Sequence, residues 1–172
     1  MCPASMPSAK PARSESSVVD SNKLARTKVW GETDPAVRWQ GAFAVYGGHG
    51  TTASSTIVYE IEPGARLGWH TDATEETQYV IAGTGKLYLE DGSTHAVGPG
   101  SIFVLPTPMR HDLENTGKET FRAVAFFAAA MFTQDFDQVM LPPKSHILGT
   151  PNRDGARGRR CGRASISARR IA

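Results

Sequence analysis

The sequence has little cysteine and no long apolar run. Cys2 and Cys161 lie near opposite ends of the 172-residue chain, so neither a disulfide framework nor a thiolate metal site is expected, and we interpret both as free thiols. No apolar stretch reaches the length of about 18 residues that a membrane span needs. The N-terminus also lacks the basic start, apolar stretch and cleavage site of a secretion signal. We therefore expect a cytoplasmic protein without a membrane partner.

The two ends of the chain lack the large apolar residues that a core needs. Residues 1–25 are rich in Ser, Ala and Pro, and residues 151–172 contain seven arginines against one acidic residue, Asp154. This +6 balance leaves residues 1–150 at −4, given +2 for the whole chain. We predict a disordered leader and a disordered tail. An arginine-rich arm for nucleic acid is the alternative, but no aromatic residue is interleaved for base stacking, so nucleic acid is not expected as a partner.

Residues 26–145 are instead rich in short strand-like segments that end in turn residues. The chain has 17 glycines and 11 prolines, and clusters of Gly, Pro, Asn or Asp separate the segments. Structure is expected from TKVWG onward, followed by strands in WQGAFAVYGGHG, SSTIVYEIEPG, TQYVIAG, GKLYLEDG, THAVGPG, SIFVLP, HDLENTG and FRAVAFF. Short strands without intervening helices predict a single antiparallel sandwich or barrel rather than βαβ units.

One segment breaks this pattern near the end of the predicted domain. In AAAMFTQDFDQVML, residues 128–141, Phe132, Phe136 and Met140 recur every four residues. Such a stripe is typical of an amphipathic helix. We expect a short C-terminal helix lying across the barrel.

Polar residues of one parity gather in GWHTDATEETQYVIAGTG, residues 68–85. In an extended chain, alternate residues face the same side. The residues that share a side are His70, Asp72, Glu76 and Gln78, whereas Glu75 points the other way. Imidazole and carboxylate are ligands of Fe(II), Mn(II), Zn(II) or Ni(II), so this pattern predicts a metal site.

A metal site of this kind needs a second histidine from elsewhere in the chain. His49, His95 and His146 lie in predicted turns or hairpins, where a surface position is expected. His111 begins a strand directly after the turn PTPMR, which would return it towards the first cluster. We therefore predict that His111 completes the site.

These residues carry a resemblance to a known family. GARLGWHTDATEETQYVIAG resembles the first cupin motif (G, five residues, HxH, three or four residues, E, six residues, G), and GSIFVLPTPMRHDLEN resembles the second (G, five residues, PxG, two residues, H, three residues, N). The matching positions are Gly64, His70, Asp72, Glu76 and Gly83, then Gly100, Pro106, Pro108, His111 and Asn115. Pro108 stands where the family has glycine, which only stiffens a turn. The likeness extends over about residues 40–130 and is to small single-domain cupins of the quercetin-dioxygenase-like group.

The resemblance implies a jelly-roll barrel of the double-stranded β-helix type and a metal ligand set. The implied ligands are His70, Asp72, Glu76 and His111, holding a divalent ion, with Fe(II) favoured and Mn(II), Ni(II) or Zn(II) possible. Asp72 stands in place of the family's second histidine. It is interpreted as a ligand, as a base beside a His70, Glu76 and His111 site, or as a sign of lost metal binding.

The resemblance also implies an activity on a small-molecule substrate, in a protein expected to form homodimers. A dioxygenase acting on a hydroxylated or carbonyl-bearing molecule comes first, with Asp72 or Glu76 taking the substrate proton and Gln78 beside them. Alternatives are a redox-neutral isomerase or decarboxylase, in which the metal is a Lewis acid, and a noncatalytic small-molecule-binding module.

Parity and a second resemblance suggest further pocket residues. Tyr88, Leu113, Phe126 and Arg122 are possible pocket residues by their positions in the predicted strands. The pair His70 and Asp72 with His111 also resembles the facial triad of 2-oxoglutarate oxygenases. In that family an arginine placed like Arg122 binds the cosubstrate, although the chain is small for that group.

Overall fold

The computed structural model describes residues 18–151. Residues 1–17 of the predicted leader and residues 152–172 of the predicted tail, with both cysteines, lie outside the described residues. Residues 18–25 contain a single 3₁₀ turn, η1 (Ser21–Lys23). Within the described part, no helix is long and apolar enough to cross a membrane.

The described chain is almost entirely strand. The strands are β1 (Thr27–Gly31), β2 (Arg38–Val45), β3 (Ser55–Ile61), β4 (His70–Asp72), β5 (Glu76–Ala82), β6 (Gly85–Leu89), β7 (Thr94–Val97), β8 (Ile102–Leu105), β9 (His111–Asn115), β10 (Phe121–Phe127), β11 (Thr133–Leu141) and β12 (Ser145–Gly149), with a second 3₁₀ turn η2 (Gly47–His49) between β2 and β3. Each strand expected from the sequence is present.

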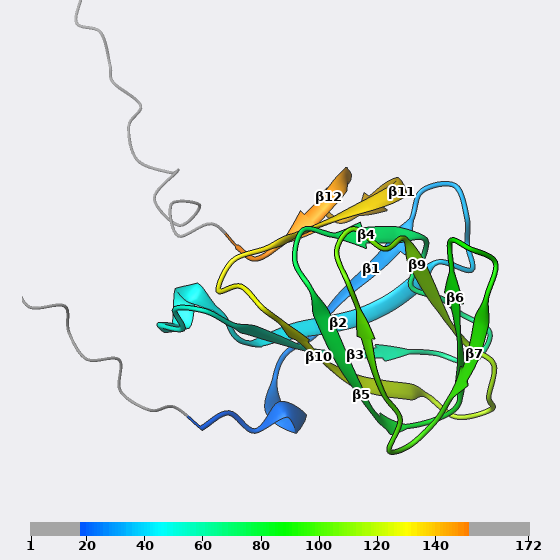
Figure 1. The fold of residues 1–172 in the computed structure, drawn as a ribbon, viewed down its shortest axis with the longest axis horizontal. Helices are drawn as coiled ribbons and strands as arrows, with labels where there is room; N and C mark the ends of the chain where they lie inside the picture. The colour runs from blue at the N-terminus through cyan, green and yellow to red at the C-terminus, as the bar shows by residue number, and fades with distance from the viewer. Residues whose placement is uncertain (1–17, 152–172) are drawn as a thin grey trace, which may run out of the picture.

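The strands form one antiparallel sheet that curls into a barrel (Figure 1). Their order is β7-β6-β9-β4-β11-β1-β2-β3-β10-β5-β8, and β12 pairs with β11. Neighbours in this order are often distant in sequence, as for β4 beside β9 and β11. The predicted all-β, jelly-roll type of barrel is confirmed.

The predicted C-terminal helix is wrong. Thr133–Leu141 is β11, which pairs with β4, β1 and β12. A repeat of four residues suits one face of a helix, but it is also a multiple of the two-residue repeat of a strand. Phe136 and Met140 are both buried on one face of β11. The structured part also continues past residue 145, the predicted end of the domain, through β12.

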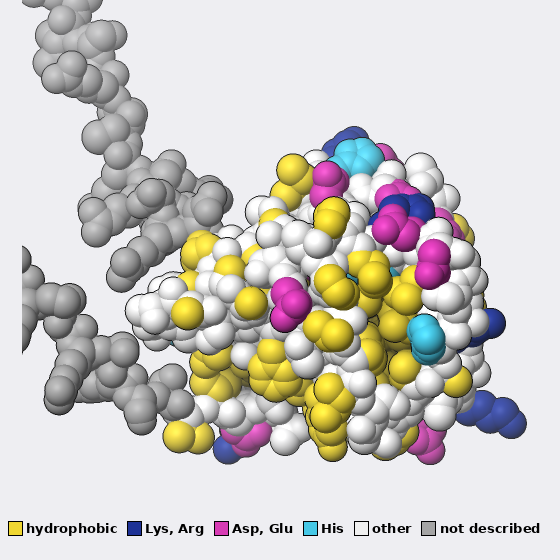
Figure 2. Space-filling view, in the orientation of Figure 1, with side chains coloured by type: hydrophobic (Ala, Val, Ile, Leu, Met, Phe, Trp, Pro, Cys, Tyr) yellow, Lys and Arg dark blue, Asp and Glu magenta, His cyan; other side chains and the backbone are white. Residues whose placement is uncertain are grey.

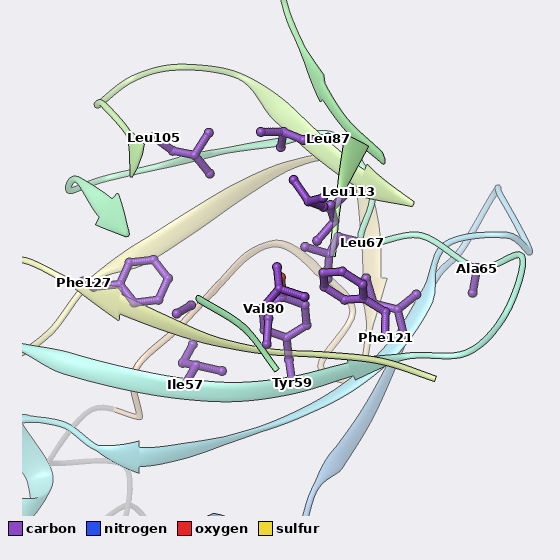
Figure 3. Close-up of a cluster of buried hydrophobic side chains, with 14 of the residues drawn as sticks. Ile57, Tyr59, Ala65, Leu67, Val80, Leu87, Leu105, Leu113, Phe121 and Phe127 are labelled. Carbon is purple, nitrogen blue, oxygen red and sulfur yellow. The ribbon is translucent and has the colours of Figure 1, made fainter. Parts of the chain in front are cut away.

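The barrel interior is a cluster of apolar side chains, several of which Figure 3 labels. On β10 the odd-numbered residues Phe121, Ala123, Ala125 and Phe127 are buried, and each large side chain removed from water contributes on the order of 2 kcal/mol. Gly83 lets β5 turn tightly against β10, because its φ is +76° and a Cβ there would lie 2.7 Å from the Cα of Phe121. The core therefore fixes β5 and β10 as one wall of the barrel.

The outer face of β5, β8 and β10 exposes large hydrophobic side chains. They are Tyr79, Ile81, Ile102, Val104 and Phe126, and Figure 2 shows hydrophobic side chains gathered over this part of the molecule. Exposed apolar patches of this kind often mark interaction surfaces. The homodimer expected from the sequence stays a prediction.

Candidate metal centre

Three strands bring the predicted ligand residues to one place inside the barrel. His70 and Asp72 are the ends of β4, Glu76 begins β5, and His111 begins β9. His70 pairs directly with His111 across β4 and β9. All four side chains are buried, whereas Glu75 is exposed. The alternation of faces predicted from the sequence therefore holds across the turn between β4 and β5.

The donor atoms of these side chains converge. His70, Asp72 and His111 each offer an atom, and the three atoms lie within 4.8 Å of one another. The Nε2 atom of His111 is 3.7 Å from Oδ2 of Asp72 and 3.6 Å from Oε2 of Glu76. These separations are too long for hydrogen bonds but suit atoms that surround a common centre. The cluster can hold a metal ion.

Both histidines are held in the orientation that a metal ligand needs. Nδ1 of His70 lies 2.7 Å from the carbonyl oxygen of Gly68, and Nδ1 of His111 lies 3.0 Å from that of Met109. A carbonyl only accepts, so Nδ1 carries the proton and donates it. Nε2 of each neutral ring is then left with a free lone pair. Fixing the tautomer through the other ring nitrogen is the usual arrangement in metal sites.

The four facing atoms have no hydrogen-bond partner. In residues 18–151, seven buried side-chain nitrogen or oxygen atoms are unpaired. Four of them are His70 Nε2, Asp72 Oδ2, Glu76 Oε2 and His111 Nε2. An unpaired buried polar atom costs roughly 1–3 kcal/mol, so four in one place require an explanation. A cation held by His70, Asp72 and His111 satisfies three of them, and Glu76 Oε2 lies beside it, 3.6 Å from His111 Nε2. The residues therefore fit the metal that the resemblance implies.

Burial and mutual repulsion shift the pKa values in the cluster. Burial, and then the charge of His111, lower the pKa of His70 to about 3. Burial, and then the charge of Glu76, raise the pKa of Asp72 to about 7. Burial lowers the pKa of His111, but the adjacent Glu76 and Asp72 outweigh this and raise it above its ordinary value. The metal-free site therefore holds protons near neutral pH that a cation would displace.

Further buried polar and aromatic residues lie around the cluster, and only Gln78 was predicted from the sequence. The predicted Gln78 is buried and accepts a hydrogen bond from the hydroxyl of Tyr59. Gln134 donates to Oδ1 of Asp72 at 2.9 Å, and Phe136 stacks on the ring of His70 with 4.7 Å between centroids. Tyr59, Gln134 and Phe136 were missed because they lie on β3 and β11, outside the two motifs. A correct assignment of residues 133–141 as a strand would have suggested the last two.

The other pocket candidates do not reach the cluster. Tyr88 donates to Glu114 on the outer face, Phe126 is 48% exposed, and Arg122 pairs with Glu60 at 3.1 Å. Leu113 is fully buried, as expected, but in the apolar core. His49, His95 and His146 are exposed, as predicted.

The cluster borders a small internal chamber. Its volume is about 30 Å³, and its walls include His70, Glu76, Tyr59 and Phe136. This is room for a group no larger than about two water molecules. Together, the antiparallel barrel and the buried His, Asp and Glu cluster define the class of barrel proteins with an internal metal-binding site.

Comparison with known proteins agrees with this barrel fold. A family model described as a cupin domain matches residues 57–127. Similar solved structures include an oxalate decarboxylase of Bacillus subtilis (20% identity, TM-score 0.58, 68% of this chain and 30% of that chain) and the Lactobacillus farciminis oxalate decarboxylase in a formate complex (19%, 0.57, 67% and 34%). The polyketide cyclase RemF from Streptomyces resistomycificus is also similar (19%, 0.57, 66% and 79%).

Residues 57–127 are similar to the cupin domain, and the described chain has a barrel fold of the cupin type. The likeness to the solved structures is one of fold, and the chain spans only 30 to 34% of the two oxalate decarboxylases. No curated protein matches the sequence.

Proposed function

We propose that the protein is a metal-dependent cupin enzyme. The observation that carries this proposal is the convergence of four buried, unpaired ligand atoms from His70, Asp72, Glu76 and His111. A noncatalytic module has no need to retain such a cluster, because each unpaired atom lowers stability. We assign all four residues as ligands of one divalent ion, with Fe(II) favoured and Mn(II), Ni(II) or Zn(II) as alternatives.

Asp72 is proposed as a ligand rather than a relic of lost metal binding. Gln134 engages only Oδ1 of its carboxylate, and Oδ2 stays free on the side of His111. A residue without a role would be expected to pair both oxygens or to turn to water. The bond from Gln134 also fixes the direction of the free oxygen, as outer partners of metal ligands commonly do.

The finer proposal is a dioxygenase acting on a small hydroxylated or carbonyl-bearing molecule. When bound, the ion would supply Lewis acidity and, if it is iron, a path for the electrons that pass from the oxidised substrate to O₂. Proton transfer is assigned to Asp72 or Glu76, because both carboxylates have an unpaired oxygen at the site and a carboxylate in reach of the substrate can accept its proton. Gln78, tied to Tyr59, lies two residues along β5 from Glu76 and is assigned to orient the substrate.

A redox-neutral reaction is the second candidate. Two structural neighbours are named for decarboxylation and cyclisation, and neither name describes a net oxidation. The same metal would then serve as a Lewis acid only. The cosubstrate arginine of a 2-oxoglutarate oxygenase is not supported, because Arg122 is engaged with Glu60 on the outer face.

Metal analysis tests the central proposal. Protein purified without chelator should contain about one divalent ion per chain, and His111→Ala should lose it because one of the four ligands is gone. The matched control is His95→Ala, which removes an exposed histidine of β7 and should retain the metal. Unchanged metal content in the folded His111→Ala protein contradicts the assignment.

Oxygen uptake separates the two activities. Protein loaded with Fe(II) should consume O₂ when it turns over a substrate if it is a dioxygenase. Turnover at an unchanged rate without O₂, also with Zn(II) in place of iron, would instead favour the redox-neutral candidate.

A further inference from the structure

A second, larger cavity adjoins the metal chamber. Its volume is about 520 Å³, and it lies between β2, β12 and the segment that precedes β1. Three residues, Trp39, Ile57 and Gln134, line both cavities. Gln134 is the residue that donates to Asp72. The larger cavity, called the groove below, therefore reaches the ligands of the proposed metal through a shared wall.

The lining of the groove carries no charge among the described residues. Leu24, Val29, Phe43, Pro142, Ile147 and Leu148 are representative of its walls. The chamber likewise has no Lys or Arg in its lining, and its only acidic lining residue is Glu76. A small organic anion needs cationic or multiple hydrogen-bond partners to leave water. The described walls offer no cation to such an anion apart from the proposed metal itself.

The groove does offer one buried donor. Nε1 of Trp39 is buried and has no partner within residues 18–151. A buried indole N–H usually finds an acceptor. Trp39 lines three cavities, the groove and the chamber among them, so its unpaired N–H points to an acceptor on a bound molecule. Trp39 belongs to β2, whose place is fixed by β1 and β3 on either side.

We infer that the groove binds the apolar body of an uncharged substrate, and that Trp39 donates a hydrogen bond to an oxygen of it. This inference rests on the proposed metal site, because the substrate's reacting group must enter the chamber to be acted upon. The two cavity volumes indicate which part of the substrate each cavity holds. A group of roughly one or two heavy atoms fits the chamber, and a body of about one to three rings fits the groove. A neutral hydroxylated or carbonyl-bearing ring compound has this shape. A small dicarboxylate does not.

The first test measures ligand binding with simple probes. The protein is loaded with redox-inert Zn(II), and 2-naphthol, naphthalene and oxalate are titrated by equilibrium dialysis near pH 7. We expect saturable binding of 2-naphthol and at least about tenfold weaker binding of oxalate, because the groove cannot solvate an anion. Oxalate binding more tightly than 2-naphthol overturns the inference.

Two matched variants locate the probe. Ile147→Glu places a charge on the groove wall at a side chain that is 54% exposed, so folding should tolerate it, and Ile102→Glu does the same at a 70% exposed position on β8, outside the groove. Binding of 2-naphthol should fall at least about tenfold in Ile147→Glu and stay unchanged in Ile102→Glu, with Zn(II) retained in both. Equal affinity of the two variants for 2-naphthol overturns the inference.

Trp39→Phe tests the proposed donor. It keeps an aromatic ring and removes the N–H, so we expect about three- to tenfold weaker binding of 2-naphthol and unchanged binding of naphthalene. An equal loss for both probes would mean that Trp39 only packs against the ligand, and would refute its role as a donor.

The design separates this inference from the proposed function. If no Zn(II) binds but the metal-free protein still binds 2-naphthol and Ile147→Glu weakens that binding, the proposed metal site is refuted and the proposed substrate groove is supported. If Zn(II) binds and His111→Ala abolishes this, but 2-naphthol does not bind, the groove is refuted and the metal site is supported. Light scattering adds one further outcome: a dimer that Ile147→Glu converts to a monomer, without probe binding, would show that a second copy covers the groove, and would overturn the inference.

Discussion

Two buried aspartates on neighbouring strands have opposite surroundings. Asp112 on β9 accepts hydrogen bonds from Arg66 Nε (2.6 Å) and from the backbone N–H groups of Gly68 (2.9 Å) and Leu113 (2.7 Å). Asp72 on β4 accepts one side-chain hydrogen bond, from Gln134, and its Oδ2 has no partner. Asp112 is fully buried and Asp72 nearly so. Burial alone therefore does not distinguish a structural carboxylate from a candidate ligand.

The difference lies in how completely each carboxylate is satisfied. Burial is the largest influence on the pKa of both residues and raises both, but for Asp112 the charge of Arg66 and three hydrogen bonds oppose the rise. The second-motif Asn115 resembles Asp112, since its amide bonds the carbonyls of Ile61 and Glu119 and its oxygen accepts from Gly117. Saturated polar groups hold the barrel together, and the unsaturated ones are left to bind something else.

The largest expected effect is the loss of stability in Asp112→Asn. The substitution leaves the partly buried guanidinium of Arg66 without its counter-charge, and breaking such pairs costs about 3 kcal/mol. We expect the free energy of unfolding in urea to fall by this amount, with metal binding retained in the protein that remains folded.

Asp72→Asn is the control for Asp112→Asn. Measured alongside in metal-free protein, it should not lower the free energy of unfolding. If Asp112→Asn is no more destabilising than Asp72→Asn, satisfied hydrogen bonds do not distinguish the two residues.

Asp72→Asn should stabilise the metal-free protein and weaken metal binding. The substitution removes a buried carboxylate and its repulsion by Glu76. We expect this to raise the free energy of unfolding by about 1 kcal/mol. The loss of a charged ligand should reduce affinity for Zn(II) at least about tenfold. Paired thermal melts with and without Zn(II) measure both effects, and a loss of metal-free stability would contradict the role of Asp72 as an unsatisfied ligand.

The sequence predicted the strands well where one face is plainly apolar. It failed where a helix and a strand fit the apolar pattern equally well. The repeat of Phe132, Phe136 and Met140 suits a helix face and a strand face equally, so only the pairing of β11 with its neighbours decides. On β10 large apolar side chains lie on both faces, and only the shared parity of Phe126 with Arg122 marked it as outward. These errors come from patterns that carry no information about the partner strand.

The candidate ligands were predicted from the sequence, whereas most of the residues around them were not. His70, Asp72 and Glu76 share a face because one short segment holds them, and local alternation was enough to separate Glu76 from Glu75. Tyr59 and Gln134 come from strands that only the folded sheet brings near, through the pairing of Gln134 with Asp72 across β11 and β4. Long-range register of this kind cannot be read from a single sequence.

The pH dependence of metal affinity sharpens the contrast between the carboxylates. A ligand must lose its proton before it coordinates. The pKa of His70 is lowered to about 3, so it carries no proton near neutrality and adds no pH dependence there. The raised pKa values of Asp72, about 7, and of His111 mean that both hold protons in slightly acidic metal-free protein. Affinity for Zn(II) should therefore fall as pH drops through about 7, by up to tenfold per unit for each proton displaced.

Calorimetry in buffers of different ionisation enthalpy measures these protons directly. Asp72→Asn should release fewer protons on binding Zn(II), whereas Asp112→Asn should release as many as the unaltered protein, because Asp112 is not a ligand. Equal proton release from all three would place the displaced protons elsewhere.

The smallest effect is expected at Glu75, the neighbour of a proposed ligand. Glu75 is exposed and Glu76 is buried against His111, although one peptide bond separates them. Glu75→Gln should change Zn(II) affinity by less than about twofold, because an exposed charge facing away from the site is screened by water and salt. Glu76→Gln, with the same change in chemistry, should lose at least about tenfold. A comparable loss in both variants would mean that affinity follows the summed negative charge near the site, and that the face on which a carboxylate lies does not decide its role.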